Sequence, residues 1–314
     1  MIWSRAWNKL AQRRKRAGFH SRFGGLWTDR LDAPRRLERR LDSGELSDSD
    51  ARLLRSWIEN GFWIAPRAVP VSTVEAVRQD IEQAWRTLDP RLLVEIDGRI
   101  HPLQSELRAE RTKLVDPYVH SRAAREAALA EPIRRFLRLV FEGEPLLFQS
   151  LSFERGSEQP VHQDAAYVVV TPPLAFAAAW IALEDIQPGS GELVYYPGSH
   201  RLPEFLFGGY RNWNRERDGL ELQQRYHGEL LARAAARGLQ RELFRPCQGD
   251  VLFWNADLAH GGAPITDPRL TRRSLVCHYC PADARPYYFS YKRARRQQAS
   301  HEGCAYASSH HVLG

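Results

Sequence analysis

Two histidines and one carboxylate in this chain have the residue types and spacing of a metal site. His162 and Asp164 are separated by the single residue Gln163, and His260 follows an apolar run that begins after the turn at Gly249. Two histidines and one carboxylate form the ligand set that holds a non-haem Fe(II) while leaving coordination positions open. We therefore predict that His162, Asp164 and His260 are the metal ligands and the catalytic centre.

The first part of this pattern has a rival elsewhere in the chain. His227-Gly228-Glu229 has the same spacing, and with 11 histidines and 38 acidic residues such a triplet arises about once by chance. Residues i and i+2 of a strand point to the same face, whereas around a helix they diverge by about 200°. Because we expect His162 at the start of a strand and His227 inside a helix, the sequence favours the first triplet.

Two adjacent arginines lie downstream of the third predicted ligand. Arg272 and Arg273 stand at the start of an apolar run that ends near Tyr279. A guanidinium can bind a carboxylate through two parallel hydrogen bonds, so either arginine could hold the remote carboxylate of an organic acid bound at the metal. Alternation along a strand does not choose between them, since Arg272 would share a face with His278 and Arg273 with Tyr279.

The elements that must position these residues change in character near residue 145. Before it, apolar residues recur at helical spacing after Ser47, Ser72 and Pro132, with a short strand at 62–65. After it, short apolar runs separated by glycine and proline predict an antiparallel sandwich or barrel. The predicted strands are 146–153, 161–171, 176–183, 192–196, 250–254 and 273–279. A charged, aromatic segment at 203–245, with a helix expected near 220–237, is predicted to form a lid over one mouth.

Composition limits the classes of protein that this chain could be. Of its 314 residues 43% are apolar, which argues against disorder, and no apolar run reaches the roughly 18 residues that span a bilayer. Four cysteines are too few for a disulfide scaffold and predict a cytoplasmic location. The net charge of +7 is concentrated near the ends. Residues 1–16 are expected to form a basic amphipathic helix that either packs on its own domain or makes a peripheral contact with an anionic membrane, and no nucleic-acid partner is expected.

The ordered motifs of residues 55–285 resemble the phytanoyl-CoA dioxygenase family of Fe(II)/2-oxoglutarate-dependent oxygenases. Each motif is modest alone, and their order and spacing together are specific. The motifs that carry the resemblance are Gly61-Phe62-Trp63-Ile64, His162-Gln163-Asp164, Ala179-Trp180-Ile181-Ala182-Leu183, Gly189-Ser190-Gly191-Glu192-Leu193, Pro197-Gly198-Ser199-His200, Gly249-Asp250, His260-Gly261 and Arg272-Arg273-Ser274-Leu275-Val276-Cys277-His278-Tyr279.

The resemblance implies a mainly β fold with flanking helices around a double-stranded β-helix, the cupin-like jelly roll. It implies Fe(II) bound by His162, Asp164 and His260, and 2-oxoglutarate as a cosubstrate that chelates the metal. The expected organisation is a basic N-terminal extension over 1–45, one oxygenase domain over 46–290 that includes the lid, and a basic, polar tail over 291–314 that we expect to be disordered.

The resemblance also implies residues for the cosubstrate. Motif register favours Arg272 for the remote carboxylate, with Arg273 as the alternative. Trp180 matches a position that lines the cosubstrate pocket, and Gln149 on the preceding strand is expected to hydrogen-bond the cosubstrate. The chain departs from the family at Gly262, where a serine or threonine that contacts 2-oxoglutarate is common. Whether Ser274 supplies that hydroxyl is open.

The expected activity is hydroxylation of an unactivated C–H bond of a small molecule by O₂, with release of succinate and CO₂. The substrate is expected to be anionic or lipid-like, because the predicted lid carries Arg211, Arg215, Arg217 and Arg225. The alternative is a non-catalytic jelly-roll module that docks on an anionic membrane or nucleic acid through its basic ends. A zinc hydrolase with the same ligands ranks last, because the sequence has no evident general base for it.

Overall fold

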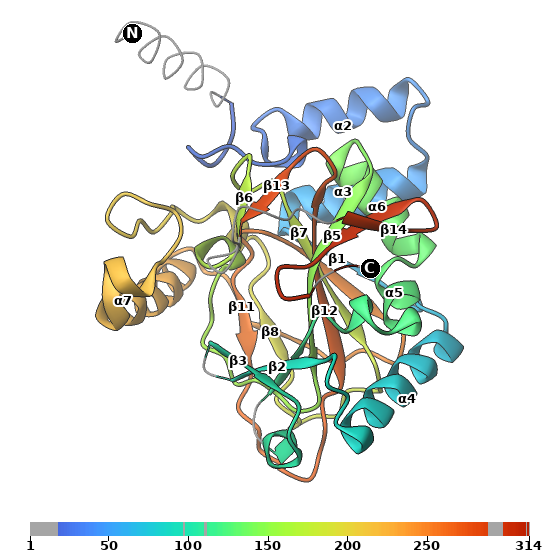
Figure 1. The fold of residues 1–314 in the computed structure, drawn as a ribbon. Helices are drawn as coiled ribbons and strands as arrows, with labels where there is room; N and C mark the ends of the chain where they lie inside the picture. Colours follow the sequence, from blue (N-terminus) through green and yellow to red (C-terminus); the bar gives the residue numbers. More distant parts are fainter. Residues whose placement is uncertain (1–17, 97, 110–111, 288–297, 312, 314) are drawn as a thin grey trace, which may run out of the picture.

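The computed structural model describes residues 18–96, 98–109, 112–287, 298–311 and 313, and Figure 1 shows their arrangement. The predicted amphipathic helix and its membrane contact, residues 1–16, lie outside the described residues, as does the basic stretch 291–296. No helix within the described part is long and apolar enough to cross a membrane.

The helices and strands follow the predicted division of the chain, with most helices before residue 145 and most strands after it. The helices are α2 (Ala33–Asp42), α3 (Asp48–Asn60), α4 (Val71–Thr87), α5 (Arg122–Ala128), α6 (Glu131–Phe141) and α7 (Arg215–Ala236). The strands are β1 (Phe62–Ala65), β2 (Leu93–Ile96), β3 (Arg99–Pro102), β4 (Lys113–Val115), β5 (Pro145–Phe153), β6 (Val169–Thr171), β7 (Ala177–Ala182), β8 (Leu193–Tyr195), β9 (Glu242–Phe244), β10 (Val251–Asn255), β11 (His260–Gly262), β12 (Ser274–Pro281), β13 (Arg285–Tyr287), β14 (Gln298–His301) and β15 (Cys304–Ala307).

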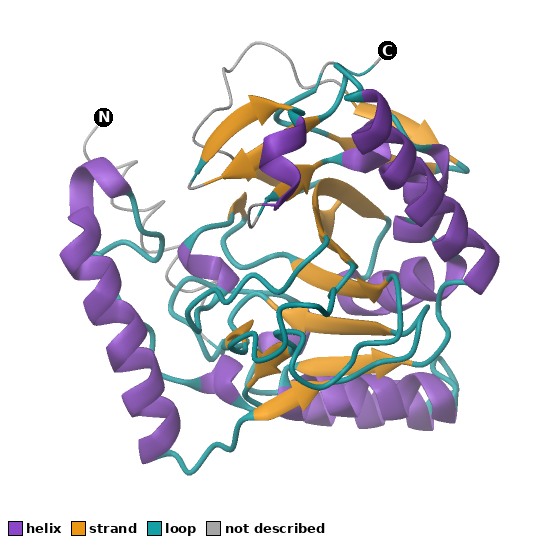
Figure 2. Ribbon diagram, turned by 90° about the horizontal axis from the view of Figure 1, so that it is seen from below, coloured by secondary structure: helices purple, strands orange, loops and turns teal. Residues whose placement is uncertain are grey.

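A large sheet and a small sheet enclose the inner core. The large sheet has the order β1-β10-β7-β12-β5-β4-β2-β3, and the small sheet has the order β11-β8-β9. Along β10, Leu252 and Trp254 pack with residues of β8 and β9, and we call this side of the large sheet its inner face. Val251 and Phe253 point to the outer face, where they pack in a second core between the sheet and the helices. Because both faces of the large sheet are covered, its central strand β7 (Ala177–Ala182) is apolar and buried at every position. Figure 2 shows the helices around the outside of the strands. The predicted cupin-like jelly roll is thus confirmed.

The predicted strand over 161–171 is wrong. His162 pairs with His260 only as an isolated β-bridge, and Asp164–Ala166 form a 3₁₀ helix before the short strand β6. The chain turns there because the backbone N–H groups of Ala166 and Tyr167 donate to carbonyls three residues earlier, and alanine is a good helix former. The other predicted strands after residue 145 differ from the observed ones only at their ends.

The predicted disorder of the C-terminal tail is also wrong for its described residues. β14 and β15 form a hairpin, and β15 pairs in parallel with β5. The Ser308 hydroxyl donates to the buried Asp116 carboxylate at 2.6 Å, and burial raises the pKa of that carboxyl to about 7. The tail was predicted to be disordered because it is polar, but its backbone pairs with the sheet.

The first described residues pack on the domain. Leu26, Leu37 and Leu46 belong to the core beneath the helices, and the Trp27 indole N–H donates to the Leu139 carbonyl at 3.0 Å. The boundary at residue 45 stays a prediction, although residues 26–46 share the core of the domain that follows.

The segment predicted as a lid carries α7, which begins at Arg215 and breaks its helical geometry at Gly219. Its Tyr226, Leu230 and Ala234 pack on Phe205 and other residues of a separate apolar cluster. Figure 1 shows α7 on the side of the barrel away from α4, α5 and α6.

Candidate active site

The three predicted ligands converge at a cavity of about 800 Å³ that opens on the inner face of the large sheet. The Nε2 atoms of His162 and His260 each lie 3.6 Å from Asp164 Oδ1. Backbone hydrogen bonds of 2.8 and 2.9 Å join His162 to His260. Gln163 is extended, with φ −112° and ψ 133°, so His162 and Asp164 reach the same point although no regular strand runs through them.

Hydrogen bonds orient both imidazole rings toward Asp164. Nδ1 of His162 donates to the Pro160 carbonyl at 2.8 Å, and Nδ1 of His260 donates to the Leu258 carbonyl at 3.0 Å. Because a proton on Nδ1 leaves a lone pair on Nε2, both Nε2 atoms can act as metal ligands. Burial lowers the pKa of His260 to about 4, which keeps its ring neutral near pH 7. The donor set fits a divalent transition metal such as Fe(II).

Two inner-face side chains that the sequence did not identify fix the Asp164 carboxylate. The Trp254 indole N–H donates to Oδ2 at 2.7 Å, and His278 Nε2 contacts the same oxygen at 3.1 Å. Although burial alone would raise it, His260 and His278 hold the pKa of Asp164 well below its ordinary value. Oδ2 is thereby occupied, and Oδ1 faces the two histidines. Trp254 lies two residues after Leu252, and His278 two residues after Val276, so their side chains point to the same inner face of the sheet. Sequence alternation could have identified them only if it had been known which face is the inner one.

The structure separates the two adjacent arginines. Arg272 lines the cavity, is 2% exposed, and has its guanidinium 5.4 and 5.7 Å from the ring centres of Phe153 and Trp180. Among the described residues, its Nε has no hydrogen-bond partner and its guanidinium has no ion pair. Burial lowers the pKa of Arg272 to about 10, so the group is still charged near pH 7. A buried cation without a partner indicates an anion site.

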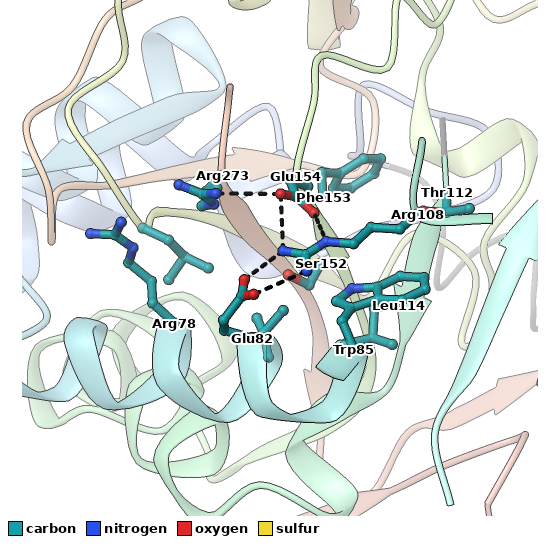
Figure 3. Close-up of a pocket in the computed structure, with 12 residues that line it drawn as sticks. Arg78, Glu82, Trp85, Arg108, Thr112, Leu114, Ser152, Phe153, Glu154 and Arg273 are labelled. Carbon is teal, nitrogen blue, oxygen red and sulfur yellow. Dashed lines mark hydrogen bonds and ion pairs between the residues drawn. The ribbon is translucent and has the colours of Figure 1, made fainter. Parts of the chain in front are cut away.

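Arg273 does not line this cavity and belongs to a separate small pocket beside α4, where Figure 3 shows it next to Glu154. Its guanidinium is 3.3 Å from a Glu154 carboxylate oxygen and 3.2 Å from one of Glu184. Arg108 pairs with the same Glu154 and with Glu82, so the charges there neutralise one another.

The other predicted cosubstrate residues, Trp180 and Gln149, line the cavity with Arg272. The Trp180 indole N–H and the Ser274 hydroxyl are buried and lack a hydrogen-bond partner within the described chain. A Cβ at Gly262 would stand 2.7 Å from the Glu158 backbone nitrogen. The serine or threonine expected at that position therefore does not fit unless the Glu158 segment moves.

The lid contributes a polar wall that sequence analysis did not predict. His227 Nε2 lies 2.9 Å from the Tyr167 hydroxyl, and Gln223 Nε2 donates to the same hydroxyl at 3.0 Å. The Tyr167 ring meets the His162 ring edge-on at 5.5 Å. Glu229 turns away and pairs with arginines of α7, as expected for a His-x-Glu triplet in a helix.

The lid arginines are arranged differently from the prediction. Arg211 is buried against Asp257, Arg217 pairs with Asp218, and Arg225 pairs with Glu229. Of these four lid arginines, Arg215 alone lines the cavity, and Arg99 of β3 joins it there. Neither Arg99 nor Arg215 has an ion-pair partner in the described ranges. The lid arginines mostly stabilise the lid itself.

Known proteins resemble this chain in sequence over most of its length. The family model for phytanoyl-CoA dioxygenase (PhyH) matches residues 57–274. The peroxisomal phytanoyl-CoA dioxygenase of Homo sapiens is 24% identical over 262 residues, which cover 78% of this chain and 71% of that protein. The enzyme of the same name from Rattus norvegicus is 25% identical over 283 residues, covering 86% and 78%.

Solved structures share the fold at low identity. The epimerase SnoN, in complex with Fe³⁺, α-ketoglutarate and nogalamycin RO, has a TM-score of 0.59 at 18% identity, covering 82% of this chain and 94% of that one. EctD from S. alaskensis, with 2-oxoglutarate and 5-hydroxyectoine, has a TM-score of 0.56 at 16% identity, covering 84% and 89%. Because the family model covers more than half of the chain, this protein belongs to the phytanoyl-CoA dioxygenase family of Fe(II)/2-oxoglutarate-dependent oxygenases, the enzyme class that its sequence motifs resemble.

Proposed function

We propose that this enzyme uses Fe(II) and 2-oxoglutarate to hydroxylate an unactivated C–H bond of a small, anionic or lipid-like substrate, with release of succinate and CO₂. One observation carries the proposal. The two-histidine, one-carboxylate cluster and the unpartnered Arg272 line a single cavity.

His162, Asp164 and His260 would hold the metal. Bound Fe(II) supplies O₂ activation coupled to oxidative decarboxylation of 2-oxoglutarate, which no side chain can perform. The protein contributes orientation: carbonyls fix the histidine tautomers, and Trp254 and His278 hold one oxygen of Asp164. Such supporting contacts raise metal affinity and keep the remaining coordination positions free for the cosubstrate and O₂.

Arg272 would bind the remote carboxylate of 2-oxoglutarate, assisted by the Ser274 hydroxyl and the Trp180 indole N–H. All three offer polar atoms without a partner among the described residues, and all are buried. A dianionic cosubstrate would satisfy these groups and neutralise the arginine, which accounts for their unpaired state. Gln149, in the same cavity, would contact the cosubstrate.

The test is anaerobic addition of Fe(II) and 2-oxoglutarate to the purified protein. We expect the weak visible charge-transfer band of a chelated 2-oxoacid. His162→Ala should abolish the band, and His200→Ala, which changes a histidine bonded to the Ile58 carbonyl, should keep it. Absence of the band in the folded, iron-loaded wild-type protein would contradict the proposal.

The cavity also supports the proposed substrate class. Arg99 and Arg215 bring positive charge to it without carboxylate partners in the described part of the chain, and Leu220 and Trp213 add apolar surface. An amphiphilic molecule with an anionic group would match both features.

Binding of hexadecanoate and of its methyl ester to the anaerobic Fe(II)–2-oxoglutarate enzyme tests the charge. We expect the carboxylate to bind at least about fivefold more tightly, roughly 1 kcal/mol. Arg215→Gln should reduce the difference and Arg99→Gln/Arg215→Gln should remove it, whereas Arg225→Gln, whose arginine pairs with Glu229, should leave it unchanged. Equal binding of acid and ester would rule out recognition of the anionic group.

A cytoplasmic location is proposed on the basis of the cysteines. All four are free, and Cys277, Cys280 and Cys304 are buried. Free buried thiols are typical of reducing compartments. Cell fractionation of the tagged protein tests this location.

A further inference from the structure

Gln163, the residue between the first two predicted ligands, is held by the lid. It is 3% exposed, and its backbone N–H donates to the Tyr226 hydroxyl at 2.7 Å. Its side-chain carbonyl accepts a hydrogen bond of 2.8 Å from Arg211. Tyr226 belongs to α7 and Arg211 to the loop before it, so one lid residue holds the backbone of Gln163 and another holds its side chain.

The same lid arginine contacts the segment that carries the third ligand. Arg211 pairs with the Asp257 carboxylate, three residues before His260. The Asp257 carbonyl in turn accepts a 2.6 Å hydrogen bond from the Gln163 side-chain amide. Arg211, Gln163 and Asp257 therefore form a closed hydrogen-bonded triangle between the two ligand-bearing segments.

Burial makes this triangle rigid and costly to lose. Arg211 is 6% and Asp257 7% exposed, so water cannot replace the missing bonds if either partner is removed. Burial raises the pKa of Asp257, and the Arg211 charge opposes that effect. The backbone bridge joins His162 to His260, and the Ala165 N–H donates to the Ala256 carbonyl at 2.9 Å. Trp254 and His278 hold the Asp164 carboxylate from the other side, so the Gln163 clamp acts on the short backbone segment between the first two ligands.

We infer that Arg211 and Tyr226 are positioning residues of the metal site, and that the lid sets the distance between Asp164 and His260 by clamping Gln163 and Asp257. This inference rests on the proposed metal ligands. It assigns the lid a second task besides lining the substrate cavity: without its clamp, the donor atoms would spread and metal affinity would fall.

Titration of the metal-free full-length protein with Co(II), followed by its visible d–d absorption, tests the clamp. The double variant Arg211→Met/Asp257→Asn removes both Arg211 bonds without leaving a buried charge, while the Gln163 amide can still bond the Asp257 backbone carbonyl. We expect Co(II) binding at least tenfold weaker, within the roughly 10–100-fold range typical of lost supporting contacts. Its d–d bands should shift, because the ligand geometry changes. A purely structural role would lower the melting temperature but leave the affinity and spectrum unchanged.

Two further variants keep the test decisive. Tyr226→Phe deletes one hydroxyl, retains the ring, and should weaken Co(II) binding about threefold or more, so it serves if the double variant does not fold. Arg233→Met is the matched control, since that lid arginine bonds Glu229 and the Pro203 carbonyl and touches neither ligand segment. Wild-type affinity and spectrum in folded Tyr226→Phe or in the double variant would overturn the inference. Failure of the wild-type protein to bind Co(II), or undiminished binding by His162→Ala, would instead overturn the proposed metal site.

Discussion

Arg272 and Arg273, the two residues directly before β12, have opposite surroundings on the two faces of the large sheet. On the inner face, Arg272 is buried and has no acidic partner among the described residues. On the outer face, Arg273 belongs to a network in which Arg108 shares Glu154 with it (Figure 3). Both arginines have the same chemistry and are adjacent in the chain, so the difference between them lies in the face of the sheet that each side chain occupies.

The spaces beside these arginines differ as much as their partners do. The inner cavity measures about 800 Å³ and the outer one about 30 Å³, room for little more than a water molecule. The outer face is therefore a closed set of ion pairs that joins α4 to the sheet, whereas the inner face keeps charge and volume available for a ligand. An arginine identifies an anion site only where its charge is not already neutralised.

The largest difference between the faces should appear in metal binding. Asp164→Ala removes an inner carboxylate that completes the ligand set, and we expect Co(II) or Fe(II) affinity to fall at least about 100-fold. Glu154→Ala removes an outer carboxylate and should leave the affinity unchanged. Metal titrations of the two variants make the comparison, and equal losses would show that the faces are not independent.

Cosubstrate binding should distinguish the arginines next. Arg272→Gln leaves the remote carboxylate of 2-oxoglutarate without its charge partner, a loss of about 2 kcal/mol or more, equivalent to at least about 30-fold in affinity. Metal affinity should be retained. Titration of the charge-transfer band with 2-oxoglutarate measures this, and unchanged 2-oxoglutarate affinity would remove Arg272 from the site.

A smaller effect is expected from Ser274, the inner-face hydroxyl two residues from Arg272. Ser274→Ala should cost about 1 kcal/mol of 2-oxoglutarate binding, or about fivefold, because one hydrogen bond is lost. The same titration applies, and the neighbouring variant Ser152→Ala, whose hydroxyl donates to the Ser274 carbonyl, serves as control. Identical behaviour of both variants would mean that Ser274 does not replace the family hydroxyl.

The smallest effect should come from Arg273 itself. Arg273→Gln breaks partly exposed ion pairs with Glu154 and Glu184, so unfolding free energy should fall by no more than about 1 kcal/mol. Affinity for 2-oxoglutarate should change less than about twofold. Urea unfolding and the charge-transfer titration measure the two quantities. A large loss of cosubstrate affinity here would reverse the assignment of the two arginines.

The ligand cluster was predictable because its signal is local. His162 and Asp164 are two residues apart, and His260 follows a strand with a recognisable turn before it. The strand argument used for the first pair was nevertheless only partly right, since Asp164 begins a 3₁₀ helix. One extended residue, Gln163, was sufficient to bring the two ligands together.

The contacts that the sequence did not reveal are long-range. Alternation showed that Arg272 and Arg273 face opposite ways, but only the packing of β7, β8 and β12 defines which face is inner. Some lid arginines form ion pairs with residues far away in the sequence, and no local pattern predicts such pairs. Arg211, for example, pairs with Asp257, 46 residues away. The C-terminal tail was predicted to be disordered for a related reason. Its strand β15 is ordered by backbone pairing with the distant strand β5, and such pairing leaves no hydrophobic pattern in the sequence.

The hairpin of β14 and β15 has a practical consequence for shortened versions of this protein. Ala305 and Tyr306 pair with Leu146 and Leu147, the half of β5 that β4 does not reach. Deleting the hairpin would expose apolar strand backbone at that edge, a template for intermolecular pairing and precipitation. Shortened versions should therefore retain residues 298–307, so that β5, the strand that carries Gln149, keeps β15 as its neighbour.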